Sequence, residues 1–80
     1  MNEQKVLWEI AEKYCEELAP DLNGEPRGQV KVKSLIIKGQ INRARYYLFG
    51  YLEGLEAAKI RVDYRDKDFV NINNKKTVTA

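Results

Sequence analysis

Few side chains in this sequence could act as nucleophiles, general bases or metal ligands. The chain has no histidine, its one serine is Ser34 and its one cysteine is Cys15. A serine or cysteine nucleophile needs a neighbouring base, and a zinc site needs several nitrogen or sulfur ligands. No two carboxylates stand together in an apolar segment, where general acid and base catalysis would place them. We therefore expect a protein that is not an enzyme and that has no catalytic residue and no cofactor.

Three aspartates, Asp63, Asp66 and Asp68, come closest to a metal-binding motif. Basic residues stand between them, where a calcium loop would carry further ligands. A loop of about twelve residues counted from Asp63 would also end at Asn74 instead of a glutamate. We expect no metal site.

The length and composition point to a single domain inside the cell. A chain of 80 residues can support one hydrophobic core but not two. No apolar run approaches the roughly 18 residues that span a bilayer, and Met1–Lys5 lacks the pattern of a secretion signal. We expect one cytoplasmic domain over residues 1–80 that makes no contact with membranes.

The formal net charge of +2 hides an uneven distribution along the chain. Met1–Pro26 holds two basic and seven acidic residues, for a net charge of −5. Arg27–Ala80 holds twelve basic and five acidic residues, for a net charge of +7. A basic region joined to an acidic element suits a protein that turns one face toward a polyanion. The alternative is that these charges only solvate the surface.

The strongest periodic signal lies in Ile41–Ala58. One arc of a helix over this segment gathers the apolar and small residues Ile41, Ala44, Tyr47, Leu48, Tyr51, Leu52, Leu55 and Ala58. The opposite face carries Asn42, Arg43, Tyr46, Phe49, Gly50 and Glu53. Arginine and asparagine side chains have the geometry to read guanine and adenine edges. The first two turns of this helix are therefore a candidate binding surface.

An amphipathic helix is also predicted over Asn2–Ala19. Its apolar positions recur at helical spacing, and glutamates fill the other side. Pro20 cannot continue a helix, and the residues after it have the composition of a loop. Trp8 lies at the edge of the apolar arc, where it could complete the core or form a dimer contact.

The segment between these helices allows two interpretations. The alternation in Gln29–Lys33 predicts a short half-buried strand. Ser34 could then cap a short helix over Leu35–Lys38 that Gly39 ends. A single helix through 29–38 fits the same residues and stays open.

An antiparallel hairpin is predicted over Ile60–Asn73. Ile60, Val62 and Tyr64 alternate with charged residues, and Val70 and Ile72 alternate with asparagines. The pairing of the two strands requires a loop of about three or five residues within 65–69. Residues 74–80 have little to bury and are expected to form a flexible basic tail.

In the order of its elements, the segment Val30–Asn73 resembles a winged helix-turn-helix domain. The resemblance rests on Ser34–Arg45, on Leu52–Glu56 and on Ile60–Ile72. It implies an α+β fold with an N-terminal helix, a short strand, a short helix, a long helix and a C-terminal β-hairpin. It also implies a regulator of transcription whose long helix lies in the major groove of duplex DNA and whose wing contacts the backbone.

The resemblance gives roles to particular polar side chains. Those that would face bases from the long helix and the turn before it are Gln40, Asn42, Arg43 and Tyr46. Those that would face phosphates from the wing are Arg61, Arg65 and Lys67, with Lys38 extending the positive surface.

A second hypothesis makes the chain a protein-binding module or a small inhibitor. Tyr46 and Phe49 stand on the polar face of the long helix, where they either cover the hairpin or contact a partner. Trp8 is the third aromatic residue that could join such an interface or that of a homodimer. RNA is a further ligand that the charges allow.

Overall fold

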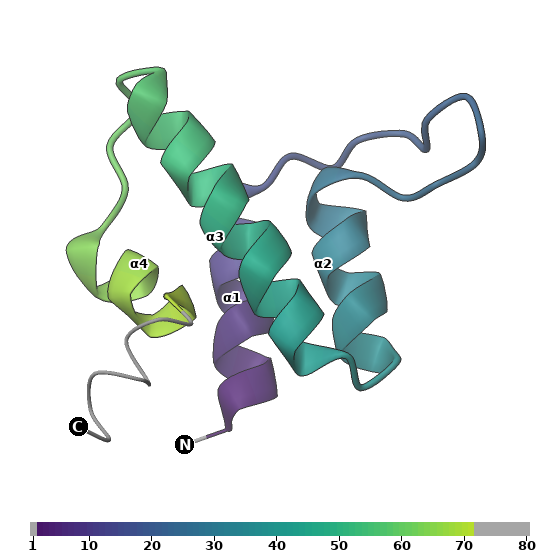
Figure 1. Ribbon diagram of the computed structural model, residues 1–80, viewed down its shortest axis with the longest axis horizontal. Helices are drawn as coiled ribbons and strands as arrows, with labels where there is room; N and C mark the ends of the chain where they lie inside the picture. Colours follow the sequence, from purple (N-terminus) through teal and green to yellow (C-terminus); the bar gives the residue numbers. More distant parts are fainter. Residues whose placement is uncertain (1, 72–80) are drawn as a thin grey trace.

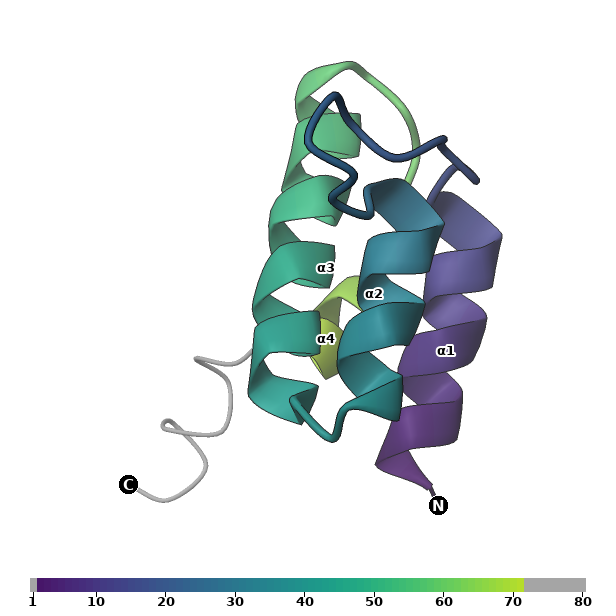
Figure 2. The ribbon, with the colours of Figure 1, turned by 90° about the vertical axis from the view of Figure 1, so that its right-hand side faces the viewer.

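A computed structural model describes residues 2–71 as four packed helices. They are α1 (Glu3–Tyr14), α2 (Gly28–Ile37), α3 (Ile41–Ala57) and α4 (Tyr64–Val70). The first three run alternately up, down and up beside one another, and α4 packs on the side of α3 away from α2 (Figure 1, Figure 2). Because residues 2–71 contain no sheet, the expected α+β fold and its winged helix-turn-helix arrangement are wrong. None of these helices has both the length and the apolar composition that crossing a membrane requires.

The first amphipathic helix is confirmed, but it is shorter than expected. Asn2 caps α1, since its side-chain oxygen accepts a hydrogen bond from a backbone N–H of the first turn at 3.2 Å. The helix stops before Cys15 because the backbone beyond it has tertiary partners. The backbone carbonyl of Cys15 accepts a hydrogen bond from the side-chain amide of Gln29 at 3.1 Å. The backbone N–H of Glu16 donates a hydrogen bond to the hydroxyl of Tyr51 at 3.2 Å.

The strand expected at 29–33 and the short helix expected at 35–38 are wrong, and one helix forms in their place. Its inward residues follow helical spacing and include Gln29, Val32, Leu35 and Ile36. Val30 is exposed, so the alternation of two valines was too short to define a strand. Ser34 lies within α2 and does not cap it.

The glycine turn and the long helix are confirmed. Gly39 has a φ of +78°, and the N–H groups of Gly39 and Gln40 bond to carbonyls of the last turn of α2, each at 2.9 Å. The next helix, α3, starts at Ile41 and buries Ala44, Leu48 and Leu52 from the expected arc. A turn of residues 38–40 therefore joins α2 and α3 into an antiparallel helical pair (Figure 2).

A loop and a helix replace the β-hairpin expected at 60–73. Asp63 caps α4, because its carboxylate accepts a hydrogen bond from the N–H of Arg65 at 2.8 Å. The helix turns Phe69 and Val70 toward the core, and Val70 is fully buried. The expected tail at 74–80 and the last two hairpin residues lie outside the described residues.

The buried side chain of Arg45 connects three helices. It is 3% exposed, and its Nε donates a hydrogen bond to Glu3 of α1 at 2.7 Å. Another guanidinium nitrogen donates to the carbonyl of Phe69 in α4, and the guanidinium carbon lies 4.9 Å from the centre of the Phe69 ring. The side chain thereby fixes α1 and α4 against α3.

Hydrogen bonds fix the long connection between α1 and α2 at its base, next to α2, and in the turn at its tip. At the base, the N–H of Gly28 donates to the hydroxyl of Tyr47 at 2.9 Å. In the turn, the Asp21 carboxylate accepts hydrogen bonds from two backbone N–H groups at 2.8 and 3.0 Å. The loop extends beyond the start of α2 and leaves Leu22 fully exposed (Figure 1).

Candidate functional site

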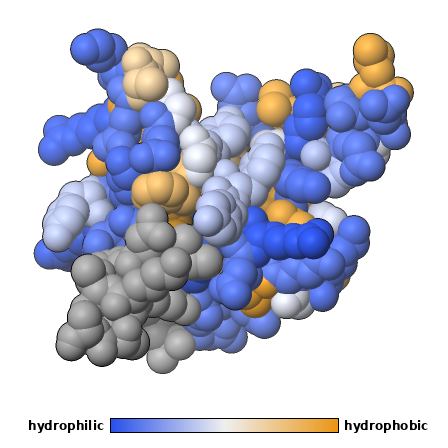
Figure 3. All heavy atoms as spheres, in the orientation of Figure 1, coloured by the Kyte–Doolittle hydropathy of each residue, from blue (hydrophilic) through white to orange (hydrophobic). Residues whose placement is uncertain are grey.

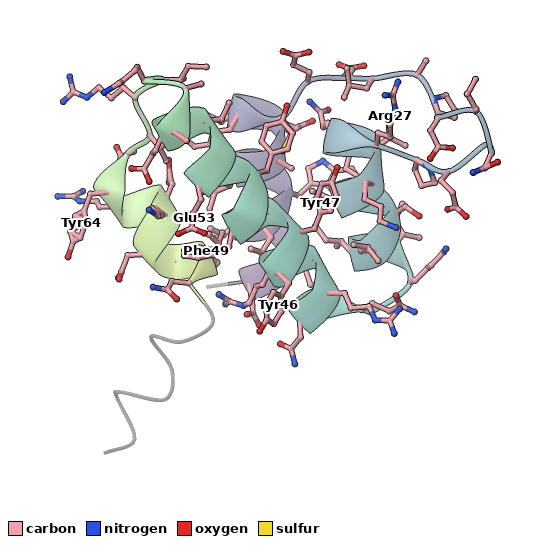
Figure 4. The ribbon with its side chains drawn as sticks, turned by 45° about the horizontal axis from the view of Figure 1, so that its top comes forward. Arg27, Tyr46, Tyr47, Phe49, Glu53 and Tyr64 are labelled. Carbon is pink, nitrogen blue, oxygen red and sulfur yellow. The ribbon has the colours of Figure 1, made fainter. Side chains whose placement is uncertain are left out.

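An open groove separates the exposed edges of α2 and α3. Its volume is about 470 Å³, and it is lined by Lys31 and Leu35 from α2 and by Asn42, Arg43, Tyr46 and Tyr47 from α3. Tyr47 lies on the side of α3 that faces α2 (Figure 4). The groove brings together three of the residues expected to bind nucleic acid, Asn42, Arg43 and Tyr46.

Two local features hold the walls of this groove together. The turn of residues 38–40 sets the start of α3 beside the end of α2. At the other end of α2, Tyr47 accepts the hydrogen bond from Gly28, whose φ is +60°. A Cβ added to Gly28 would lie 2.4 Å from the carbonyl oxygen of Glu16, so only glycine fits there. As a result, α2 is attached to α3 at both of its ends.

The part of the chain that lines the groove, residues 31–47, carries only positive formal charges. No acidic residue occurs between Glu25 and Glu53, whereas six basic residues do: Arg27, Lys31, Lys33, Lys38, Arg43 and Arg45. Three of the six are engaged within the fold. Arg45 bonds to Glu3, Lys33 pairs with Glu12 at 2.9 Å, and Arg27 donates to the Ala19 carbonyl at 2.9 Å.

The remaining three cations have no polar side-chain partner anywhere in residues 2–71: Lys31, Lys38 and Arg43. The start of α3 adds to their positive field. Gln40 precedes this helix without capping it through its side chain, and the first turn of α3 has no acidic residue. The first N–H groups of a helix carry partial positive charge and attract anions.

Comparison with known proteins leaves the chemistry of the groove as the guide to function. No known protein family, curated protein or solved structure matches this chain.

The cations expected in a wing do not join the groove. Arg61, Arg65 and Lys67 belong to α4 and the loop before it, on the side of α3 away from α2 (Figure 1). Lys67 is also engaged, since it pairs with Glu56 and its Nζ lies 5.6 Å from the centre of the Phe49 ring. Because a loop and α4 take the place of the expected wing, the phosphate contacts expected from a wing do not apply to these three residues.

Of the three aromatic residues expected to contact a partner, only Tyr46 is largely open to solvent, with 66% of its surface exposed. Phe49 is half-buried on the side of α3 that faces α4 (Figure 4). Trp8 is half-buried, and the Nζ of Lys33 lies 4.8 Å from its ring centre. On the face viewed in Figure 3, hydrophobic residues form small separate patches among hydrophilic ones.

The sequence interpretation missed Lys31. The expected strand made it an ordinary polar position, facing away from the core. In a helix over 29–38, Lys31 stands four residues before Leu35 and so shares an edge with it. The lack of any acidic residue from Pro26 to Leu52 was the second available signal.

A second cluster of titratable groups joins α1 to α4. The hydroxyl of Tyr14 donates to Asp66 at 2.7 Å, and Lys13 lies 2.9 Å from the same carboxylate oxygen. Burial alone would raise the pKa of Asp66, but the hydrogen bonds from Lys13 and Tyr14 outweigh it and hold this pKa below its ordinary value. Burial and the bond to Asp66 raise the pKa of Tyr14 above its ordinary value. These groups satisfy one another and hold α4 in place.

The one cysteine of the chain is buried. Burial raises the pKa of the Cys15 thiol to about 11, so the thiol is protonated near neutral pH. Within residues 2–71, no three side chains of the metal-ligating types histidine, cysteine, aspartate and glutamate are grouped to hold an ion.

Proposed function

We propose that this chain is a non-enzymatic, cytoplasmic DNA-binding protein that uses the groove between α2 and α3 and the turn that joins these helices. The observation that carries the proposal is that Lys31, Lys38 and Arg43 lack acidic partners on a surface that also presents Asn42 and Tyr46. Cations of this kind attract a phosphate backbone, because binding releases the counterions condensed on it.

The arrangement provides contacts of two kinds. Lys31, Lys38 and the start of α3 suit phosphate oxygens, which position a protein on DNA without reading its sequence. Asn42 suits a base edge, because its amide offers both a donor and an acceptor, and the guanidinium of Arg43 can donate to a base edge or to a neighbouring phosphate. A sequence preference arising at these two side chains would make the chain a regulator of transcription.

The acidic part of the chain supports a one-sided contact. Its net charge of −5 belongs to α1 and the loop after it, which contribute no residue to the groove. Phosphates are repelled from that part and attracted to the basic face of α2 and α3.

Fluorescence anisotropy tests the proposal with a labelled DNA that carries both a duplex and a single-stranded overhang. Affinity should fall steeply with salt, and Lys31→Ala should lower the slope of log affinity against log salt by about one. Arg43→Ala should weaken binding by about 1 to 3 kcal/mol, with little change in folding stability.

Arg65→Ala is the matched control, because Arg65 is an exposed arginine on α4, away from the groove. This variant should bind as the unchanged protein does. Absence of binding at low salt, or an equal loss in Arg65→Ala and Arg43→Ala, would contradict the proposal.

A further inference from the structure

The groove has an apolar and aromatic interior that contacts with phosphates alone would not use. Leu35 is 7% exposed and lines it from α2, while Tyr47 lines it from α3. Lys31 and Arg43 could bind phosphates equally well from a flat surface. A shallow, mostly apolar groove flanked by a few polar groups instead suits one face of a flat, mostly apolar ring system.

The charges on the walls limit what that ring can be attached to. Lys31 stands on the α2 wall and Arg43 on the α3 wall, and neither has an acidic partner among residues 2–71. A ring with a negative group on either side would complement both walls. A nucleobase in a nucleic-acid strand has a phosphate on either side of it. In a duplex the base faces are stacked inside the helix, so only an unpaired base can enter such a site.

Two side chains of α3 match an unpaired base. Tyr46 presents an exposed ring, and aromatic rings bind bases by stacking with little regard to sequence. Asn42 lies one helical turn earlier and offers both a donor and an acceptor for the edge of the base.

We infer that the groove holds one unpaired nucleobase of a single strand, stacked on Tyr46, with the flanking phosphates at Lys31 and Arg43. The inference rests on the proposed function and names the ligand of the same site. DNA and RNA strands offer the same bases and phosphates, so the experiment includes both.

Anisotropy of four labelled probes with the full chain tests the inference. The probes are a DNA strand that cannot pair with itself, the same strand with abasic sites, its duplex, and the RNA strand of the same sequence. The abasic strand keeps every phosphate and lacks the bases. The intact strand should bind on the order of tenfold more tightly than either the abasic strand or the duplex.

Two variants locate the effect in the groove. Tyr46→Ala should bring the intact strand down to the affinity of the abasic strand, whereas Tyr46→Phe should keep most of the difference because its ring still stacks. Tyr64→Ala is the control: Tyr64 is 76% exposed on α4 and lies outside the groove, so its loss should change nothing.

The outcomes separate this inference from the proposed function. Equal binding of intact and abasic strands, or tighter binding of the duplex, overturns the unpaired-base site and leaves DNA binding in place. Tighter binding of the RNA strand than of the DNA strand supports the site and makes RNA its source. If no probe binds, both the site and the proposed function are wrong.

Discussion

The hydroxyl oxygen of Tyr47 lies 2.9 Å from the backbone nitrogen of Gly28 and accepts its hydrogen bond. The two residues belong to α2 and α3, the helices on either side of the groove, and are 19 positions apart in the chain. Gly28 is the first residue of α2, where the helix has no carbonyl of its own for the N–H group. A side chain of α3 therefore does the work of a helix cap for α2.

Tyr47→Phe removes this cap and keeps the ring. We expect a loss of about 1 kcal/mol in the free energy of unfolding, because a partly buried N–H loses its acceptor. Urea denaturation followed by circular dichroism measures the change. Tyr46→Phe is the control, because no hydrogen bond within residues 2–71 uses its hydroxyl. Equal stabilities of the two variants would show that the bond contributes nothing.

Gly28→Ala should be more damaging. The residue has a φ of +60°, and its new Cβ would lie 2.4 Å from a backbone oxygen of Glu16. We expect a loss of about 1 to 3 kcal/mol, since a left-handed residue with a side chain is strained and the oxygen cannot move freely. Gly54→Ala is the opposite case, because α3 has open space there and alanine favours helices by about 1 kcal/mol. Thermal melting should move the two variants in opposite directions.

Arg45→Ala tests the connection between α1, α3 and α4. Removing this buried guanidinium takes away the hydrogen bonds that it donates to Glu3 and to the Phe69 carbonyl, and because the Glu3 side chain is 38% exposed we expect a loss of about 1 to 3 kcal/mol. The exposed Arg43 stands two residues earlier on the same helix, and its replacement by alanine should change stability by less than about 0.5 kcal/mol. Similar urea midpoints for both variants would rule out the structural role of Arg45.

The stability of the fold should depend on the protonation of Asp66. The hydrogen bonds from Lys13 and Tyr14 hold its pKa in the folded protein below the value in the unfolded chain, so folding favours the charged form. The resulting stabilisation is complete above the pKa of the unfolded chain and is lost as pH falls through the lower, folded value. Asp66→Asn should therefore be less stable than the unchanged protein at about pH 7, and the difference should shrink in strong acid. A difference that stays constant with pH would refute this.

Lys59 is a non-glycine residue with a left-handed backbone, at a φ of +67°, directly after the C-cap of α3. Glycine adopts this conformation without a steric penalty, so Lys59→Gly should stabilise the protein by roughly 1 kcal/mol. Ala58→Gly should have the reverse effect, because Ala58 has a right-handed φ of −87°. Thermal melting of the two variants decides the matter, and destabilisation by Lys59→Gly would speak against the strain.

The sequence predicts correctly those parts of the fold in which an apolar pattern repeats over several helical turns or in which a specific residue marks a turn. The long helix repeats its apolar spacing over several turns, and Gly39 marks the turn before it. In contrast, α2 and α4 are short, and two or three alternating residues fit a strand as well as a helix. Asp63 followed by Asp66 was a local sign of a helix start, but the apolar alternation around it was given more weight.

The sequence predicts those residues of the candidate site that share one helix face. It does not predict the residue that enters the site through the packing of two helices. Asn42, Arg43 and Tyr46 follow from the polar face of α3 alone. Lys31 enters the site only because α2 is a helix packed beside α3, and that contact is set by Tyr47 and the turn at Gly39. The cations at 61–67 were placed in a wing because the hairpin was assumed.

The loop between α1 and α2 is closed at its base by contacts that do not use its tip. The entropy of closing a loop changes little when a few residues are added, so the length of the tip is not critical to the fold. A peptide tag, a fluorophore or a second domain can therefore be inserted near Leu22 and Gly24, where the backbone faces open space. Such an insertion gives the molecule a handle by which it can be immobilised while α2 and α3 keep their spacing.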